Sequence, residues 1–206
     1  MIKKNEKHNE NKENSSKDWS TDYTILDGNI SCLSANNRDQ DDFEHNWENY
    51  ALPCILSYNK GERGIISPLN SAKKNRLIRQ KDWDGANCPT CGQIMEHYPR
   101  KRFGIELGNA LTISHSISRK IFGGTNEEWN LRPSCNWCNR TDGIVVNNHL
   151  LNMDNISQEE RIRIAQWSMS LDYEEVSSDE IHPVLNKEFT SLREQVEKKY
   201  CSEGVF

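Results

Sequence analysis

Apolar side chains are spread unevenly along the chain, and their spacing divides it into four parts. Residues 1–20 contain almost none, so they cannot bury enough surface to offset the entropy of ordering, and we expect a disordered tail. Residues 21–60 mix acidic and apolar positions and predict a small N-terminal adapter. Residues 61–150 hold every motif with chemical meaning, and residues 151–206 have the apolar spacing of a helical extension.

Period-two alternation in residues 111–115 predicts a short strand that ends at a histidine. The glycine pair 123–124 marks a sharp loop, and residues 130–133 predict a return strand that is stopped by its proline. A helix is expected to begin near Asn136 and to end at Gly143. The order strand, loop, strand, helix predicts a ββα unit inside an α+β fold.

Helix signals dominate the last part of the chain. Ser157 and Glu160 have the spacing of a capping box. Beyond Pro183, apolar residues recur at helical spacing. These are Val184, Leu185, Phe189, Leu192, Val196 and Tyr200. We therefore expect flanking helices after the ββα unit.

Charge narrows the range of functions. The chain has 206 residues with a formal net charge of −5, which excludes a uniformly basic protein that coats nucleic acid. Residues 51–103 nevertheless hold ten basic and four acidic side chains, and a polyanion would meet this stretch. Taken alone, its cluster at 71–81 fits an ordinary solvated helix better. The basic residues of interest there are Lys73, Lys74, Arg76 and Arg79.

No apolar run approaches the roughly 20 residues of a membrane helix. The first thirty residues also lack the apolar core of a secretion signal. We expect an intracellular protein that is not embedded in a membrane. The sequence leaves its compartment and its oligomeric state open.

Four of the seven cysteines form two close pairs, Cys88-Pro-Thr-Cys91 and Cys135-Asn-Trp-Cys138. A two-residue spacing lets both thiolates of a turn bind one ion, and two such turns complete a tetrahedral zinc site. Gly92, directly after the first pair, suits the tight turn of a zinc knuckle. The pattern predicts one structural Zn²⁺ per chain.

Redox chemistry, disulfide bonding and chance compete with zinc as the reason for the cysteine pairs. A redox motif would need a βαβ context, which the surrounding glycine, proline and asparagine do not favour. Disulfides are disfavoured in a reducing compartment, and unrelated buried thiols would make the spacing accidental. The remaining cysteines have no partner at ligand spacing and are treated as ordinary thiols; they are Cys32, Cys54 and Cys201.

The segment from about residue 86 to 145 contains His115, a Gly-Gly loop, Asn130 before a leucine, and the run Cys-Asn-Trp-Cys-Asn that ends at Asn139. In this order the motifs resemble those of the HNH nucleases, which have the ββα-metal fold. The upstream pair Cys88 and Cys91 matches the outer cysteines with which many members close a structural zinc site. The resemblance covers less than a third of the chain.

The resemblance implies a role for each matched residue. His115 would be the general base, Asn130 would tie the loop that holds the histidine, and Asn139 would bind a catalytic Mg²⁺ or another divalent cation. The family acts on DNA and touches mainly the phosphate backbone. Four basic residues of the segment are candidates for gripping phosphates: Arg119, Lys120, Arg132 and Arg140.

One position departs from the family pattern. Ser114 stands where the family usually has a metal-binding aspartate, and a hydroxyl is a poorer ligand for a hard divalent cation than a carboxylate. Ser114 could bind the ion weakly, Glu106 or Asp142 could substitute for the missing carboxylate, water could fill the place, or activity could have been lost.

Three functions follow from these expectations. The leading one is a metal-dependent endonuclease that hydrolyses DNA phosphodiester bonds with His115 as base. The second is a catalytically inactive, zinc-containing module that binds nucleic acid. The third is a zinc domain that binds another protein through its acidic ends. Metal-dependent cleavage and salt-sensitive DNA binding distinguish the three.

Overall fold

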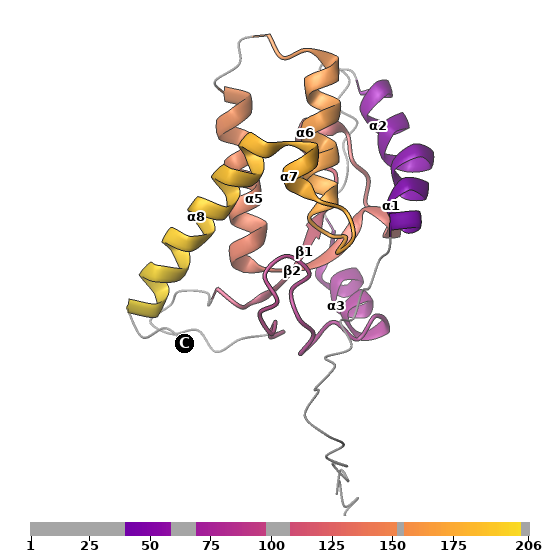
Figure 1. The fold of residues 1–206 in the computed structure, drawn as a ribbon. Coiled ribbons are helices and arrows are strands. Elements are labelled where there is room, and N and C mark those ends of the chain that lie inside the picture. Colours follow the sequence, from indigo (N-terminus) through magenta and orange to yellow (C-terminus); the bar gives the residue numbers. More distant parts are fainter. Residues whose placement is uncertain (1–39, 59–68, 98–107, 152–154, 203–206) are drawn as a thin grey trace, which may run out of the picture. The chain divides into compact units, whose positions relative to one another are not determined.

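The computed structural model describes residues 40–58, 69–97, 108–151 and 155–202, and the account below concerns these residues only. The tail expected at residues 1–20 and the first half of the adapter lie outside them, as does Glu106. The described chain combines helices with one two-stranded antiparallel sheet, so the expected α+β class is confirmed (Figure 1).

The two strands form the hairpin at the centre of the ββα unit. Strand β1, Leu111–His115, pairs with strand β2, Leu131–Cys135, so that Ser114 lies opposite Arg132. The prediction that Pro133 stops the second strand is wrong, because it pairs with Ile113 inside β2. In a two-stranded sheet each strand has a free edge, so a missing N–H need not break the ladder.

Helix α5, Asn136–Leu151, follows β2 directly and packs against both strands and against α8, Pro183–Ser202. The prediction that Gly143 ends this helix is wrong, because α5 continues to its last residue at 151. Gly143 has no positive φ and therefore does not act as a left-handed cap. Packing along α5 outweighs the roughly 1 kcal/mol that a glycine costs inside a helix.

The remaining helices surround the hairpin and α5. Helix α6, Gln158–Ser170, is capped by Ser157, whose side chain accepts a hydrogen bond from the Glu160 amide at 3.1 Å. This is the serine half of the predicted capping box, whereas the Glu160 carboxylate contacts His149 and His182. The expected surface helix is α3, Ser71–Gln80. The other elements are α1 (Gln40–Asn46), η1 (Trp47–Ala51), α2 (Leu52–Ser57), α4 (Arg119–Phe122), η2 (Glu128–Asn130) and α7 (Ser178–Ile181).

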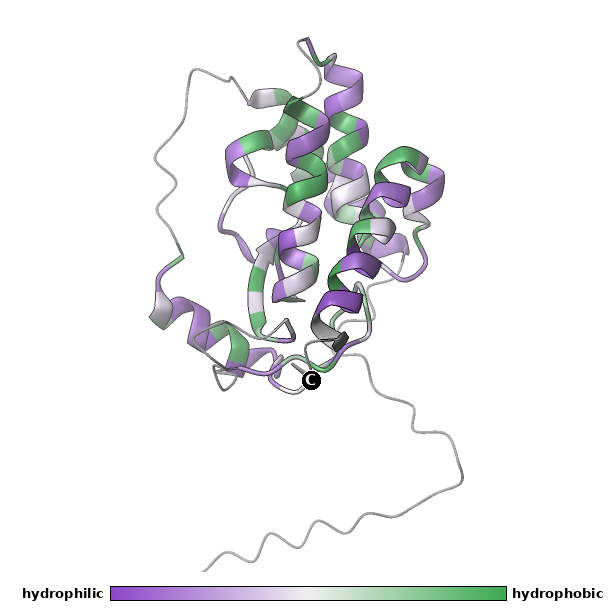
Figure 2. Ribbon diagram, turned by 90° about the vertical axis from the view of Figure 1, so that its left-hand side faces the viewer, coloured by the Kyte–Doolittle hydropathy of each residue, from purple (hydrophilic) through white to green (hydrophobic). Residues whose placement is uncertain are grey.

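A single hydrophobic core joins the helices to the hairpin. Trp167 of α6 is fully buried and meets Phe189 of α8 edge to face, with ring centroids 5.8 Å apart. Figure 2 shows apolar and polar residues alternating along the helices, as expected for elements with one buried face. Among the described helices, none is both long enough and apolar enough to cross a membrane.

Candidate active site and metal centre

The four paired cysteines meet at one point of the fold. The Sγ atoms of Cys88, Cys91, Cys135 and Cys138 all lie within 4.8 Å of one another, and Cys91 and Cys135 are 3.7 Å apart. Zn–S bonds of about 2.3 Å in a tetrahedron place sulfurs roughly 3.8 Å apart. The cluster therefore has the size and the donor set of a tetrahedral Cys₄ metal site.

Local backbone structure aims each pair at this point. The Gly92 amide donates to the Cys88 carbonyl at 2.8 Å, and Gly92 has φ of +73°, which closes the tight turn that the sequence predicted. The second pair joins the end of β2 to the first turn of α5. Its amides face sulfur: Cys135 N lies 3.5 Å from the Cys88 Sγ, and Cys138 N lies 3.4 Å from the Cys135 Sγ.

The close approach of the four cysteine thiols fits a metal site better than a redox-active cysteine pair. Hydrogen bonds from Cys135 and Cys138 lower the pKa of Cys88, while the hydrogen bond with Cys135 raises the pKa of Cys138. A cation would let all four become thiolates. The shared cluster, with sulfurs well beyond the roughly 2.05 Å of a disulfide bond, disfavours paired disulfides.

His115 lines a pocket of about 280 Å³ at the junction of the hairpin, α4 and α5. Ser114 and Asn139 line the same pocket, so the structure brings together the histidine, the helix asparagine and the serine that the sequence singled out. His115 ends β1, and Asn139 lies in the first turn of α5. The junction of β2 with α5, at the second cysteine pair, places them side by side.

The imidazole of His115 is held in a partly buried position. Its Nε2 lies 2.9 Å from Oδ1 of Asn126. Burial lowers the pKa of His115, the hydrogen bond with Asn126 opposes this, and the charge of Arg119 lowers the pKa further. The ring is therefore neutral at neutral pH, which is the form that accepts a proton.

Two neutral oxygens face each other beside the histidine. Ser114 Oγ donates to Asn139 Oδ1 at 2.9 Å, and Asn139 Nδ2 donates to Thr112 Oγ1 at 3.2 Å. The second bond fixes the amide so that its oxygen points toward Ser114. Two oxygens converge here, but neither side chain is charged.

Asn130 is fully buried and ties the loop between the strands. Its Oδ1 accepts from the Ile117 amide at 2.7 Å, and its Nδ2 donates to the carbonyls of Ile117 at 3.0 Å and Thr125 at 2.9 Å. Gly124 packs directly against this amide, which accounts for the glycine at this place in the loop. These bonds are of the kind that the family resemblance implies for Asn130.

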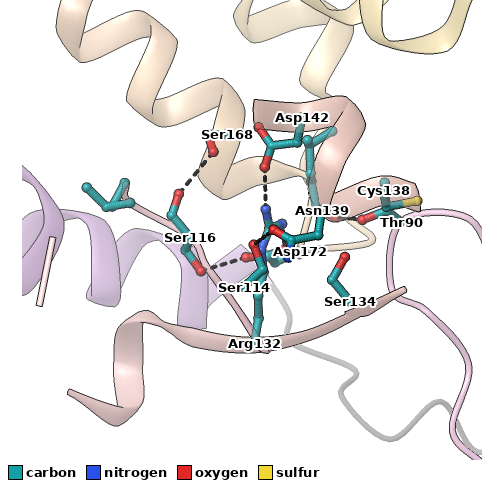
Figure 3. Close-up of polar contacts among 12 residues, drawn as sticks. Thr90, Ser114, Ser116, Arg132, Ser134, Cys138, Asn139, Asp142, Ser168 and Asp172 are labelled. Carbon is teal, nitrogen blue, oxygen red and sulfur yellow. Dashed lines mark hydrogen bonds and ion pairs between the residues drawn. The ribbon is translucent and has the colours of Figure 1, made fainter. Parts of the chain in front are cut away.

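Arg132 does not reach a surface that a phosphate could contact. It is 3% exposed, its guanidinium lies 2.6 Å from the Asp142 carboxylate, and it also pairs with Asp172, which accepts from the Ser116 hydroxyl (Figure 3). The expectation that Arg132 grips a phosphate is therefore corrected: the side chain is a buried tie between the hairpin, α5 and the end of α6. Asp142 also lines the pocket, and burial raises its pKa to about 6 although the charge of Arg132 opposes this.

The other predicted phosphate contacts lie where solvent reaches them. Arg119 and Lys120 line the pocket from α4, and Arg140 is exposed on α5. Helix α3 lies against the loop between β1 and β2, since the Lys73 ammonium donates to the Asn126 carbonyl at 3.1 Å. The remaining predicted basic residues of α3 are exposed; they are Lys74, Arg76 and Arg79.

The structure also brings together two histidines and a glutamate, a cluster that the sequence did not predict. Glu160 Oε1 lies 3.1 Å from His149 Nε2 and 2.9 Å from His182 Nε2, which joins α5, α6 and the start of α8. His182 Nδ1 accepts from the Leu185 amide at 3.3 Å, so its Nε2 carries the proton and donates to Glu160. A metal at that nitrogen would need the proton on Nδ1 instead, so the cluster fits a hydrogen-bonded clamp between helices better than a metal site.

Comparison with known proteins agrees with the geometry. Residues 88–143 match the family model described as HNH endonuclease, a span that begins at Cys88, the first of the four clustered cysteines, and includes His115, Asn130 and Asn139. No curated protein and no solved structure matches the chain significantly.

Proposed function

We propose that this chain, whose residues 88–143 match the HNH endonuclease family model, hydrolyses DNA phosphodiester bonds with a divalent cation, and that His115 is the general base. One observation carries the proposal: His115, Ser114 and Asn139 line one pocket that Arg119 and Lys120 also line. A base, two oxygen ligands and cations for phosphate are the groups that this reaction needs.

In this proposal the residues of the chain transfer a proton and position the phosphate. Neutral His115 takes a proton from the attacking water, and Arg119 and Lys120 draw the phosphate into the pocket. The loop tied by Asn130 keeps the histidine at the pocket, because its backbone is fixed on both sides of the turn. When bound, the divalent ion supplies the positive charge that stabilises the phosphate and the leaving oxygen.

Asn139 and Ser114 are the residues that would hold this ion. Their oxygens converge at 2.9 Å and are oxygen donors of the type that Mg²⁺ prefers, so the donor set fits. Both are neutral, and Asp142, the one carboxylate among the described residues of the pocket, is paired with Arg132. We therefore expect weak binding that needs millimolar ion and that water ligands complete.

The cysteine cluster would hold a separate, structural Zn²⁺. Cys88, Cys135 and Cys138 are at most 2% exposed and Cys91 is partly buried, and four sulfur ligands leave no position on the ion for substrate. This zinc would fix β2 and α5 to the turn that carries Cys88 and Cys91, and it would thereby set the position of Asn139.

A second function keeps the fold without the chemistry. The neutral pair Ser114 and Asn139 beside the buried Arg132 favours a DNA-binding module that has lost its catalytic ion. A cleavage assay on supercoiled plasmid distinguishes the nuclease from the DNA-binding module. The nuclease predicts nicked and linear product with Mg²⁺ or Mn²⁺, and none with a chelator that leaves the structural zinc in place.

The same preparation is tested for binding without divalent ions. Salt-sensitive binding with no cleavage under any metal would replace the nuclease by the binding module, and absence of binding would favour a protein partner. His45→Ala, an exposed histidine on α1, is the matched control for His115→Ala.

A further inference from the structure

One side chain that touches the candidate base has no counterpart in the motif that identified the site. Asn126 lies in the loop between α4 and η2, and its Oδ1 is 2.9 Å from Nε2 of His115. Asn130, the asparagine of the motif, bonds to the loop backbone, whereas Asn126 bonds to the ring itself.

We propose that Asn126 is a positioning residue for His115. A carboxamide oxygen only accepts hydrogen bonds, so the ring nitrogen that it faces must donate. The neutral imidazole is then fixed as the tautomer with the proton on Nε2, and Nδ1 is the nitrogen that takes the proton from water. This inference rests on the proposed nuclease function.

The tautomer matters because a neutral imidazole has one donor and one acceptor. A base that presents its N–H to the water cannot remove a proton from it. For metal-ligating histidines, the partner that fixes the tautomer and the ring orientation is worth about 10–100-fold in metal affinity or activity, and we take the same range for a histidine base. A loss of this size is expected when the acceptor at position 126 is removed.

The surroundings of Asn126 hold its carboxamide at the ring. The residue before it is fixed by the bond from Asn130 Nδ2 to the Thr125 carbonyl at 2.9 Å. Its own carbonyl accepts from the Lys73 ammonium at 3.1 Å, which ties it to α3. The loop is thus fastened both to the hairpin and to the basic helix, and the partner of His115 is placed by both.

The test reads the tautomer directly by nitrogen NMR of the full chain labelled at histidine, at a pH where the ring is neutral. The His115 signal is identified by its loss in His115→Gln. We expect the Nε2–H form in the wild type and a mixture with the Nδ1–H form in Asn126→Leu, which has a similar size and no acceptor. Asn126→Asp keeps an oxygen acceptor and is expected to restore the Nε2–H form.

Cleavage kinetics give the second readout. Asn126→Leu is expected to lower kcat about 10–100-fold with unchanged KM for DNA, and Asn126→Asp to recover most of the rate. Asn148→Leu, at an exposed position of α5, is the control for the same change of side chain. If Asn126→Leu melts lower than the wild type, Asn126→Ala, which needs no additional space, takes its place.

Two outcomes would overturn the proposal. One is an Nδ1–H tautomer in the wild type, and the other is an unchanged tautomer once the acceptor is removed. Because the tautomer is read without DNA or divalent ion, a wild type that never cleaves DNA would end the proposed function while this measurement still decides the role of Asn126.

Discussion

Gly124→Ala is the substitution for which the structure gives the sharpest expectation. A Cβ at this position would lie 2.0 Å from the Ile117 carbonyl oxygen and 2.7 Å from Asn130 Nδ2. Ordinary carbon–oxygen contacts lie at about 3.3 Å or more, so the loop must open by over roughly 1 Å. That movement separates the Asn130 amide from the carbonyls of Ile117 and Thr125.

The magnitude follows from these contacts. Forcing a methyl group into a packed site costs about 1–3 kcal/mol, and each lost hydrogen bond costs about 1 kcal/mol. Gly124→Ala should therefore lower the free energy of unfolding by about 3–5 kcal/mol. Gly143→Ala is the matched control: its Cβ would meet nothing within 4 Å, and inside α5 it should stabilise by up to about 1 kcal/mol.

Urea unfolding followed by tryptophan fluorescence measures both variants, since the chain has six tryptophans. A Gly124→Ala protein within about 0.5 kcal/mol of the wild type would show that the loop can relax freely. The close packing of Gly124 on Asn130, and with it the assigned role of Asn130, would then be refuted.

Three further changes test other parts of the structure. If the cysteine cluster holds zinc as proposed, Cys138→Ser should abolish zinc binding and the cooperative melting of the wild type, because binding at a structural zinc site contributes to the free energy of folding. Metal analysis and calorimetry check this, and unchanged melting would contradict it. Glu160→Gln should lower the stability by about 1–3 kcal/mol near neutral pH, because the hydrogen bond from His182 lowers the pKa of Glu160. The stabilisation by ionised Glu160 is complete above the unfolded pKa of about 4.3 and disappears as the pH falls through the lower folded pKa. The free energies of unfolding of wild type and variant should therefore converge in acid, and a difference that stays constant with pH would refute this prediction. Replacing Arg119 and Lys120 by glutamine should reduce the salt dependence of DNA binding by about one unit of slope each; an unchanged slope in a salt titration would remove them from the interface.

Local patterns in the sequence were sufficient for the core of the fold. The strand that ends at His115 and the tight turn after Cys91 depend on alternation, spacing and a glycine with positive φ, all of which are local. The cluster of four sulfurs could be predicted because two short pairs leave few other arrangements. The extent of α5 could not, since packing along the helix outweighs the stop signal of Gly143.

The features that the sequence did not predict depend on distant partners. Arg132 is buried because Asp142 and Asp172 meet it from α5 and from the end of α6, and no local pattern brings these three together. Asparagine is a common residue in loops, so nothing in the sequence distinguishes Asn126 until the loop folds onto His115. The division of the chain into domains at residues 20, 60 and 150 stays a prediction.

Single-turnover cleavage of a labelled DNA duplex by excess protein tests the central claim most directly, because binding and chemistry are then measured on the same complex. We predict that the wild type cleaves with Mg²⁺ or Mn²⁺, and that His115→Ala binds the duplex equally well but cleaves at least about 100-fold more slowly. Equal cleavage rates for the two proteins, or a saturated wild-type complex that leaves the duplex intact, would contradict the account.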